Sequence, residues 1–211
     1  MQAAFDNEKL KIENGEWEEK KLGEVCEKTE TVNPKIEPNE EFIYIDVSSV
    51  NKETKIIEKT TVLKGEDAPS RARKLVKTND VIFATVRPTH QRVAIISDEF
   101  NNQVCSTGYY VLRAKEFIHY KIIYYFILTF SFNKEMEKLQ KGASYPAVTN
   151  KEVETRIIYY PKSLETQKQI VAQLDRLQGE TKKLEAIYRQ KLDNLEEMKK
   201  SVLQKAFNGE L

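Results

Sequence analysis

Basic and hydrogen-bonding side chains gather in one window of this sequence. Residues 59–92 hold 8 Lys and Arg against 3 Asp and Glu, whereas residues 1–58 hold 8 against 15, giving net charges of +5 and −7. Within this window, Arg87-Pro88-Thr89-His90-Gln91-Arg92 combines guanidinium, hydroxyl, imidazole and amide groups. Arg can bind guanine through two hydrogen bonds, Gln can bind adenine in the same way, and Lys or Arg neutralises phosphates. The window therefore predicts a DNA-binding loop.

A second candidate stretch is Lys141-Gly142-Ala143-Ser144-Tyr145. Its Gly lets the backbone approach a phosphate, and the Ser and Tyr hydroxyls can donate to it. For both stretches, an ordinary solvated surface is the alternative that the sequence leaves open. The candidate DNA-binding residues are Lys64, Arg71, Arg73, Lys74, Lys77, Arg87, Thr89, His90, Gln91, Arg92, Lys141, Ser144 and Tyr145.

The sequence carries none of the common catalytic motifs. The phosphate-binding patterns GxxxxGKS/T and GxGxxG, the zinc pattern HExxH and the nucleophile pattern GxSxG are all missing. The 2 His are His90, in the basic loop, and His119, in an apolar stretch where a structural role is expected. Cys26 and Cys105 form no CxxC pair and suit reduced residues of a cytosolic protein. We therefore expect no catalysis, no metal and no cofactor in this chain.

Short β-rich runs must position these loops. Residues 81–86 and 93–96 predict a hairpin with the basic loop at its tip, and 104–112 a strand pair broken by Gly108. Residues 116–141 predict one helix and 150–156 a short one. Further strands are expected at 42–47, 55–61 and 157–161, with a first strand or turn at 17–25. The prediction is an α+β domain of many short strands over residues 17–161.

A long helix is predicted to follow this domain. Ser163 suits the N-cap, Glu165 the first turn, and Asn208-Gly209 the stop. Such a helix would run roughly 60 Å. A 4-3 stepping from residue 170 to 205 is apolar at 8 of 11 positions, which predicts a partner helix along this face, although packing on its own domain stays open. The predicted dimerisation seam is Ile170, Leu174, Leu177, Leu184, Tyr188, Leu195, Met198 and Val202.

Two further features concern the N-terminal part and the location. Residues 2–10 resemble residues 204–211, which suggests that the chain opens with the end of another copy of its last helix. No signal peptide is expected, because residues 1–11 hold no apolar run. The most apolar window, 117–132, is too short to span a bilayer. The sequence therefore predicts a cytoplasmic protein with no membrane contact.

Several stretches resemble the DNA-specificity subunit of type I restriction–modification systems. The looser matches are residues 17–24, WEEKKLGE; residues 78–82, TNDVI; and residues 104–113, VCSTGYYVLR. The more specific matches are residues 160–171, YPKSLETQKQIV, and residues 203–211, LQKAFNGEL. Together they cover nearly the full length of the chain.

This resemblance implies a non-catalytic recognition subunit. It implies a DNA target-recognition domain over residues 17–161, a spacer helix over 162–211, and a segment over 1–16 that resembles the end of a spacer helix. Members usually carry two such units and this chain carries one, so it is either half-size or the second half of a tandem subunit. The implied partners are double-stranded DNA, a second copy of the chain, methyltransferase subunits that bring S-adenosylmethionine and, through them, a restriction subunit that uses ATP and Mg²⁺.

Two other classes of protein stay open at this point. A coiled-coil scaffold whose globular domain binds another protein would have the same helix. A nuclease of unrecognised type would cleave DNA alone with a metal ion. Salt-dependent DNA binding separates the first alternative from the recognition subunit, because phosphate neutralisation gives a steep salt slope.

Overall fold

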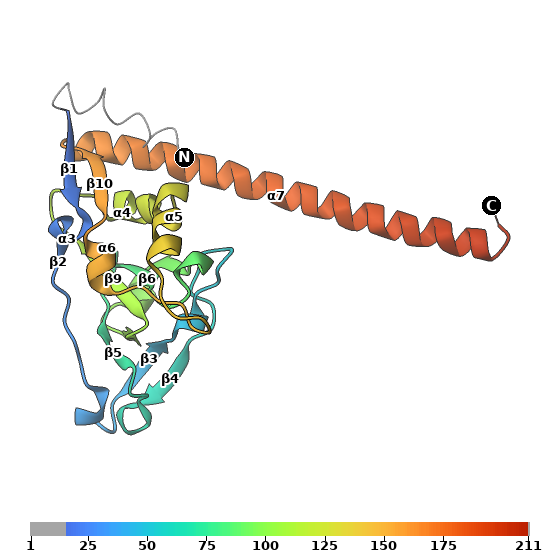
Figure 1. Ribbon diagram of the computed structural model, residues 1–211. Helices are drawn as coiled ribbons and strands as arrows, with labels where there is room; N and C mark the ends of the chain where they lie inside the picture. Colours follow the sequence, from blue (N-terminus) through green and yellow to red (C-terminus); the bar gives the residue numbers. More distant parts are fainter. Residues whose placement is uncertain (1–15, 211) are drawn as a thin grey trace. The chain divides into compact units, whose positions relative to one another are not determined.

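The computed structural model of the protein describes residues 16–210 (Figure 1). The chain divides into two compact units between Lys168 and Gln169. The predicted repeat at residues 2–10 lies outside the described residues, as does nearly all of the predicted segment 1–16. The predicted domain bounds at 17–161 and 162–211 stay a prediction.

A two-stranded ladder joins the start and the end of the first unit. Strand β1 (Trp17–Lys21) pairs antiparallel with β10 (Ile157–Pro161), from Trp17 opposite Pro161 to Lys21 opposite Ile157. Figure 1 shows the two strands side by side although they lie far apart in the sequence. The predicted strand at residues 157–161 is therefore confirmed.

The other described strands form two four-stranded sheets. The first is antiparallel and has the order β2 (Cys26–Glu27), β9 (Tyr109–Ala114), β6 (Val81–Ala84) and β7 (Val93–Ile95). The second has the order β4 (Thr61–Lys64), β3 (Glu41–Ile45), β8 (Val104–Ser106) and β5 (Ala72–Leu75), and its central pair β3–β8 is parallel. Strands β6 and β7 form the predicted hairpin, with the basic loop at its tip.

A hydrophobic core takes side chains from both four-stranded sheets. It includes Ile45 of β3, Cys105 of β8, Ile82 and Ala84 of β6 and Val111 of β9, all buried. The alternate residues of β6 point to its other face, where the Phe83 ring meets that of Phe132 edge-on with centroids 5.4 Å apart. Because both faces of β6 are covered, all four of its residues are apolar and buried.

Two helices cover this outer face, and this corrects the single helix predicted for residues 116–141. Helix α4 (Tyr120–Ile127) ends at Leu128, and α5 (Phe130–Leu139) begins after Thr129. The Thr129 hydroxyl donates to the Phe126 carbonyl at 2.7 Å and accepts from the Phe132 N–H at 3.3 Å. This N-cap starts a new helix where the apolar pattern alone favours continuation.

Short helices and 3₁₀ turns complete the first unit. The predicted helix near 150–156 is α6 (Asn150–Glu154), and Thr149 and Glu152 form its capping box. The remaining short elements are α3 (Leu22–Val25), η1 (Pro34–Ile36), η2 (Val47–Ser49), η3 (Gly65–Asp67), η4 (Pro88–His90) and η5 (Asp98–Phe100).

Two strand predictions are wrong. Residues 55–60 form no strand: Lys55 adopts a left-handed conformation with φ 61°, Ile57 forms an isolated bridge with Val50, and the strand begins at Thr61. The predicted pair within 104–112 is split, because β8 and β9 belong to different sheets. Gly108 lies at this change of sheet, where a Cβ would come within 2.6 Å of the Val47 Cγ2.

Helix α7 (Leu164–Phe207) confirms the predicted long helix, and with the short strands it confirms the α+β class. The Ser163 Oγ accepts from the Thr166 N–H at 3.4 Å, and Gly209, with φ 74°, follows the helix end. In the first turns, the buried Gln167 side chain donates to the Pro161 and Phe117 carbonyls and accepts from the His119 N–H. From Leu177 to Val202, six seam side chains are 48–62% exposed.

We expect Gly65→Ala to destabilise the first unit by about 1–3 kcal/mol. A Cβ at Gly65 would lie 2.2 Å from the Glu37 carbonyl oxygen and 2.3 Å from that of Pro34, so backbone must move. Gly179→Ala is the matched control, because a Cβ there meets nothing within 4 Å and helix propensity favours Ala. Urea denaturation followed by circular dichroism measures both, and equal losses in the two variants would contradict this view of Gly65.

Candidate nucleic-acid interface

The two stretches predicted to bind DNA lie side by side in the structure. Val86 and Ala147 form an isolated antiparallel bridge. The Arg87 N–H donates to the Pro146 carbonyl at 2.7 Å, and the Val148 N–H donates to the Thr85 carbonyl at 2.9 Å. Residues 87–92 and 141–147, which are far apart in the sequence, therefore form one surface, which we call the paired loops.

An exposed cation and an exposed aromatic ring meet on the paired loops. The Arg87 guanidinium lies over the Tyr145 ring, 5.1 Å from its centroid, and it reaches the Ser144 carbonyl at 3.5 Å. Both side chains are exposed, and Tyr145 is 72% exposed. Arg can bind a guanine edge or a phosphate, and an aromatic face can stack on a base. This pair has the chemistry of a nucleic-acid contact.

The backbone of the turn between Arg87 and Gln91 is unusual at both ends. Arg87 has φ 50° and Gln91 has φ 47°, the left-handed region that residues other than glycine seldom adopt. Within the turn, the His90 N–H donates to the Arg87 carbonyl at 3.0 Å and the Gln91 N–H to the Pro88 carbonyl at 2.9 Å. Such conformations persist only where the surroundings impose them, and they concentrate at functional sites.

Two cations fasten the end of this turn to a neighbouring segment. The Lys55 Nζ donates to the Gln91 carbonyl at 2.7 Å and to the Lys52 carbonyl at 2.5 Å. The Arg92 Nη1 donates to the Val50 carbonyl and lies 3.5 Å from that of Ser48. Arg92 thus binds protein carbonyls, while its predicted DNA contact stays a prediction. Nothing in the sequence near Lys55 pointed to its role.

His90 lies on the exposed side of the same turn. Burial lowers its pKa below the usual 6.5, and the neighbouring charges of Arg87, Lys52 and Arg92 lower it further. The imidazole is therefore mostly neutral at pH 7. A neutral imidazole offers one donor and one acceptor, which suits hydrogen bonding to a base edge better than phosphate neutralisation.

The other predicted DNA-binding residues lie on the sheet that contains β5 and β4. Lys64 and Arg71 are exposed. Arg73 donates to the Asn33 side chain at 2.7 Å, and Lys74 is half-buried on β5. The Arg71 carbonyl accepts from the Thr107 N–H, and the next residue, Gly108, accepts from the N–H of Thr85, two residues before the paired loops. No contact brings Lys64, Arg73 or Lys74 to the paired loops among the residues that the structure describes.

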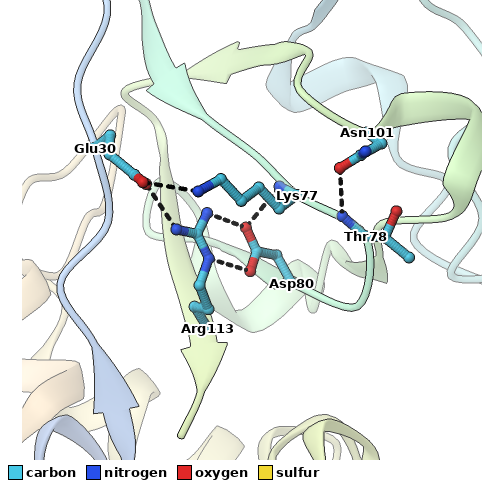
Figure 2. Close-up of polar contacts among 6 residues, drawn as sticks. All are labelled: Glu30, Lys77, Thr78, Asp80, Asn101 and Arg113. Carbon is cyan, nitrogen blue, oxygen red and sulfur yellow. Dashed lines mark hydrogen bonds and ion pairs between the residues drawn. The ribbon is translucent and has the colours of Figure 1, made fainter.

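Lys77 belongs to a charged network around a buried carboxylate (Figure 2). Asp80 is 1% exposed, and the Arg113 guanidinium binds both its oxygens, at 2.9 and 2.8 Å. The Lys77 N–H also donates to Asp80 at 2.8 Å. Outside this pair, Glu30 binds the Arg113 Nη1 at 2.6 Å and the Lys77 Nζ at 2.9 Å. The network joins the loop around Glu30, the turn before β6 and strand β9.

The network favours the charged forms of Glu30 and Arg113. Hydrogen bonds from Lys77 and Arg113 lower the pKa of Glu30 to about 2, and the bond to Asp80 raises the pKa of Arg113 above its usual value. Asn79, directly before Asp80, has φ 70°, a left-handed conformation that Asn adopts more readily than most residues and that suits a turn. The pairing of Asp80 with a residue so far along the chain gave no sequence signal.

Residues 16–210 contain neither a metal-binding cluster nor a membrane-spanning helix. This part of the chain places no three His, Cys, Asp or Glu side chains where they could hold a metal ion. It also contains no helix that is both long and apolar enough to cross a membrane.

Comparison with known proteins identifies a family over most of the chain. The sequence profile described as "Type I restriction modification DNA specificity domain" matches residues 14–196. No curated protein matches significantly.

Solved structures give the same family. The HsdS subunit from Thermoanaerobacter tengcongensis is 36% identical, with a TM-score of 0.73 over 80% of this chain and 44% of that one. A chain from a study of complex assembly and conformational transition of the type I R-M system is 34% identical, with a TM-score of 0.76 over 81% of this chain and 44% of that one. The S subunit from M. genitalium, 13% identical with a TM-score of 0.50 over 77% of this chain and 39% of that one, shows the fold alone. The chain thus spans less than half of each of these structures.

We expect Arg113→Met to destabilise the first unit by about 3–5 kcal/mol, because it leaves the buried Asp80 carboxylate without its cation. Lys77→Met is the matched control, since it removes a cation whose bond to Glu30 is about half solvent-exposed and should therefore cost much less. Chemical denaturation of both variants measures the difference. Similar losses for the two would show that the Asp80–Arg113 pair has no special weight.

Proposed function

The chain belongs to the family of type I restriction modification DNA specificity domains, and on this premise we propose that it recognises a DNA sequence on behalf of a methyltransferase complex. Its own role is recognition, and the chemistry belongs to the other subunits. The methyl donor S-adenosylmethionine, and the ATP and Mg²⁺ of the restriction subunit, bind to those partners and not to this chain.

The paired loops are the observation that carries this proposal. They bring Arg87, His90, Ser144 and Tyr145 to one exposed surface on a scaffold of strands and helices. Direct readout needs a few side chains held rigidly at base edges, with other cations on the phosphates. In our proposal Arg87, Gln91 and Tyr145 face the bases, and Arg71 and Lys141 lie near phosphates.

The partners that we propose come from the family resemblance, and the long helix offers a surface for them. Methyltransferase subunits dock along α7 and the nearby domain, and the restriction subunit joins through them. The face of α7 away from the seam carries Arg176, Lys183, Arg189, Glu196 and Lys200, which suit a polar docking surface.

A second copy of the chain completes the assembly in this proposal. The exposed seam residues from Leu177 to Val202 form an apolar stripe that a partner helix would cover. Closed two-fold symmetry is the commonest solution for such a stripe. Two identical recognition domains related by a two-fold axis would read inverted copies of one half-site, with uncontacted bases between them.

The alternative, a coiled-coil scaffold with a protein-binding domain, keeps the helix but gives the paired loops no role. It predicts no DNA affinity with a steep dependence on salt. A titration of the purified chain with duplex DNA at several salt concentrations separates the two functions.

The first test of readout uses two substitutions at Arg87. Arg87→Ala should cost about 1–3 kcal/mol in binding the recognised sequence. Arg87→Lys keeps the charge but loses the two-pronged hydrogen bonding, so it should lose discrimination between target and random duplex while keeping affinity for random DNA. Methylome sequencing of cells carrying the chain with its modification partner gives the target, and fluorescence anisotropy gives the affinities. Full discrimination by both variants would remove Arg87 from the readout.

The second test concerns symmetry. We expect the purified chain to sediment as a dimer at micromolar concentration, and Leu184→Lys with Leu195→Lys to shift it to a monomer, because charges would replace seam residues. We also expect a palindromic, interrupted methylation motif. An asymmetric bipartite motif would instead mean that a different recognition domain supplies the second half-site.

A further inference from the structure

A rigid segment lies beside the end of the 87–91 turn. Within residues 46–58, which we call the brace, the Asn51 Oδ1 accepts from the Glu53 and Thr54 N–H groups at 2.8 and 3.2 Å. The Asn51 Nδ2 donates to Glu58 at 3.0 Å, and the Thr54 hydroxyl donates to Glu58 at 2.9 Å. An isolated bridge between Val50 and Ile57 closes the segment. Although six of its thirteen residues are exposed, the brace is therefore fixed by its own hydrogen bonds.

The buried core holds the other end of the brace. Tyr109, which is fully buried on β9, directs its hydroxyl at the Asp46 and Val47 carbonyls, at 3.2 and 3.1 Å. Strand β9 also pairs with β6, the strand that leads into the 87–91 turn. The same strand therefore holds the brace, through Tyr109, and the start of the turn, through β6.

Lys55 reaches from the brace to the turn itself, beside the contact that Arg92 makes with the Val50 carbonyl. Its left-handed backbone turns the side chain back toward the protein, where it is half-buried and its ammonium bridges the Gln91 and Lys52 carbonyls. Gln91 is the residue whose φ of 47° ends the turn. A charge-assisted bond to this carbonyl supplies the outside restraint that such a backbone conformation requires.

We propose that Lys55 is a positioning residue that fixes the shape of the 87–91 turn and so sets DNA specificity without touching DNA. The effect on DNA specificity rests on the proposed function. The effect on the shape of the turn does not, and it can be measured without any DNA.

The charge of Lys55 can be changed with pH, which gives a further test of its role. Burial first, and then the neighbouring charge of Arg92, together lower its pKa from 10.5 to about 8. Lys52 lies on the same turn of the brace, while Glu99 of η5 and Tyr124 of α4 line the same cavity. Raising the pH from 7 to 9 therefore removes most of the Lys55 charge, whereas an Arg at this position stays charged.

The first experiment is hydrogen–deuterium exchange of the free full-length chain. Lys55→Met should increase exchange in peptides that contain the N–H groups of His90 and Gln91, and Lys55→Arg should restore protection. Lys52→Met is the matched control, because it removes a neighbouring exposed charge but leaves the Lys52 carbonyl in place. Unchanged exchange in Lys55→Met, or the same change in Lys52→Met, would overturn the positioning role.

The second experiment measures the ratio of affinities for target and random duplex in the assembled complex. Lys55→Met should lower this ratio roughly 10-fold, the effect of losing one hydrogen bond to a charged group, while binding to random duplex stays unchanged. The wild-type ratio should fall between pH 7 and 9, and that of Lys55→Arg should not.

The outcomes distinguish the two levels of inference. A wild-type complex that shows no preference for any duplex overturns the proposed function, and the exchange experiment still decides the role of Lys55 in the turn. A uniform loss on target and random duplex in Lys55→Met means a phosphate contact and overturns the positioning role. If Lys55→Met increases hydrogen–deuterium exchange in the turn but leaves the ratio of affinities for target and random duplex unchanged, the link between the turn and specificity is overturned.

Discussion

The carboxylate of Asp80 is the buried charge on which the first unit depends. An isolated carboxylate in a protein interior is strongly unfavourable, but here the Arg113 guanidinium and the Lys77 N–H occupy its oxygens. Asp80 directly precedes β6, and Arg113 lies on β9, the strand to which β6 is paired. The ion pair thus fixes the register of the two strands at one end, and residues 87–92 of the paired loops follow the other end of β6.

The basic residues have two roles, because some bind groups of the protein itself and others are exposed. The net charge of the 59–92 window predicts a nucleic-acid surface, but several of its cations bind groups of the protein itself. Arg73 binds Asn33, Lys77 binds Glu30, and Arg92 binds the Val50 carbonyl. The exposed cations Arg71 and Arg87 remain available to a ligand. A count of charges therefore overestimates the interface, because buried carbonyls and carboxylates also need cations.

Features fixed by neighbouring residues could be predicted from the sequence. The ends of α7 follow from Ser163 and Gly209, and strand β10 from its β-branched and aromatic run. The break at Thr129 was missed, because an apolar pattern that continues through it outweighs one capping hydroxyl when only periodicity is considered. Strand partners within 104–112 were also missed, since pairing is decided by contacts far along the chain.

The candidate site was predicted in its parts but not in its assembly. Both loops stood out by composition, yet their adjacency depends on the bridge between Val86 and Ala147, which no local pattern encodes. The role of Lys55 could not be predicted for the same reason, because its partner Gln91 lies in a different loop, far along the chain.

The β1–β10 ladder has a mechanical consequence. Trp17 faces Pro161 and the Lys162 N–H donates to the Glu16 carbonyl, so the chain enters and leaves at one end of the ladder. Tension applied between Glu16 and Lys162 would therefore open the hydrogen bonds of the ladder one after another, starting at the Trp17–Pro161 pair.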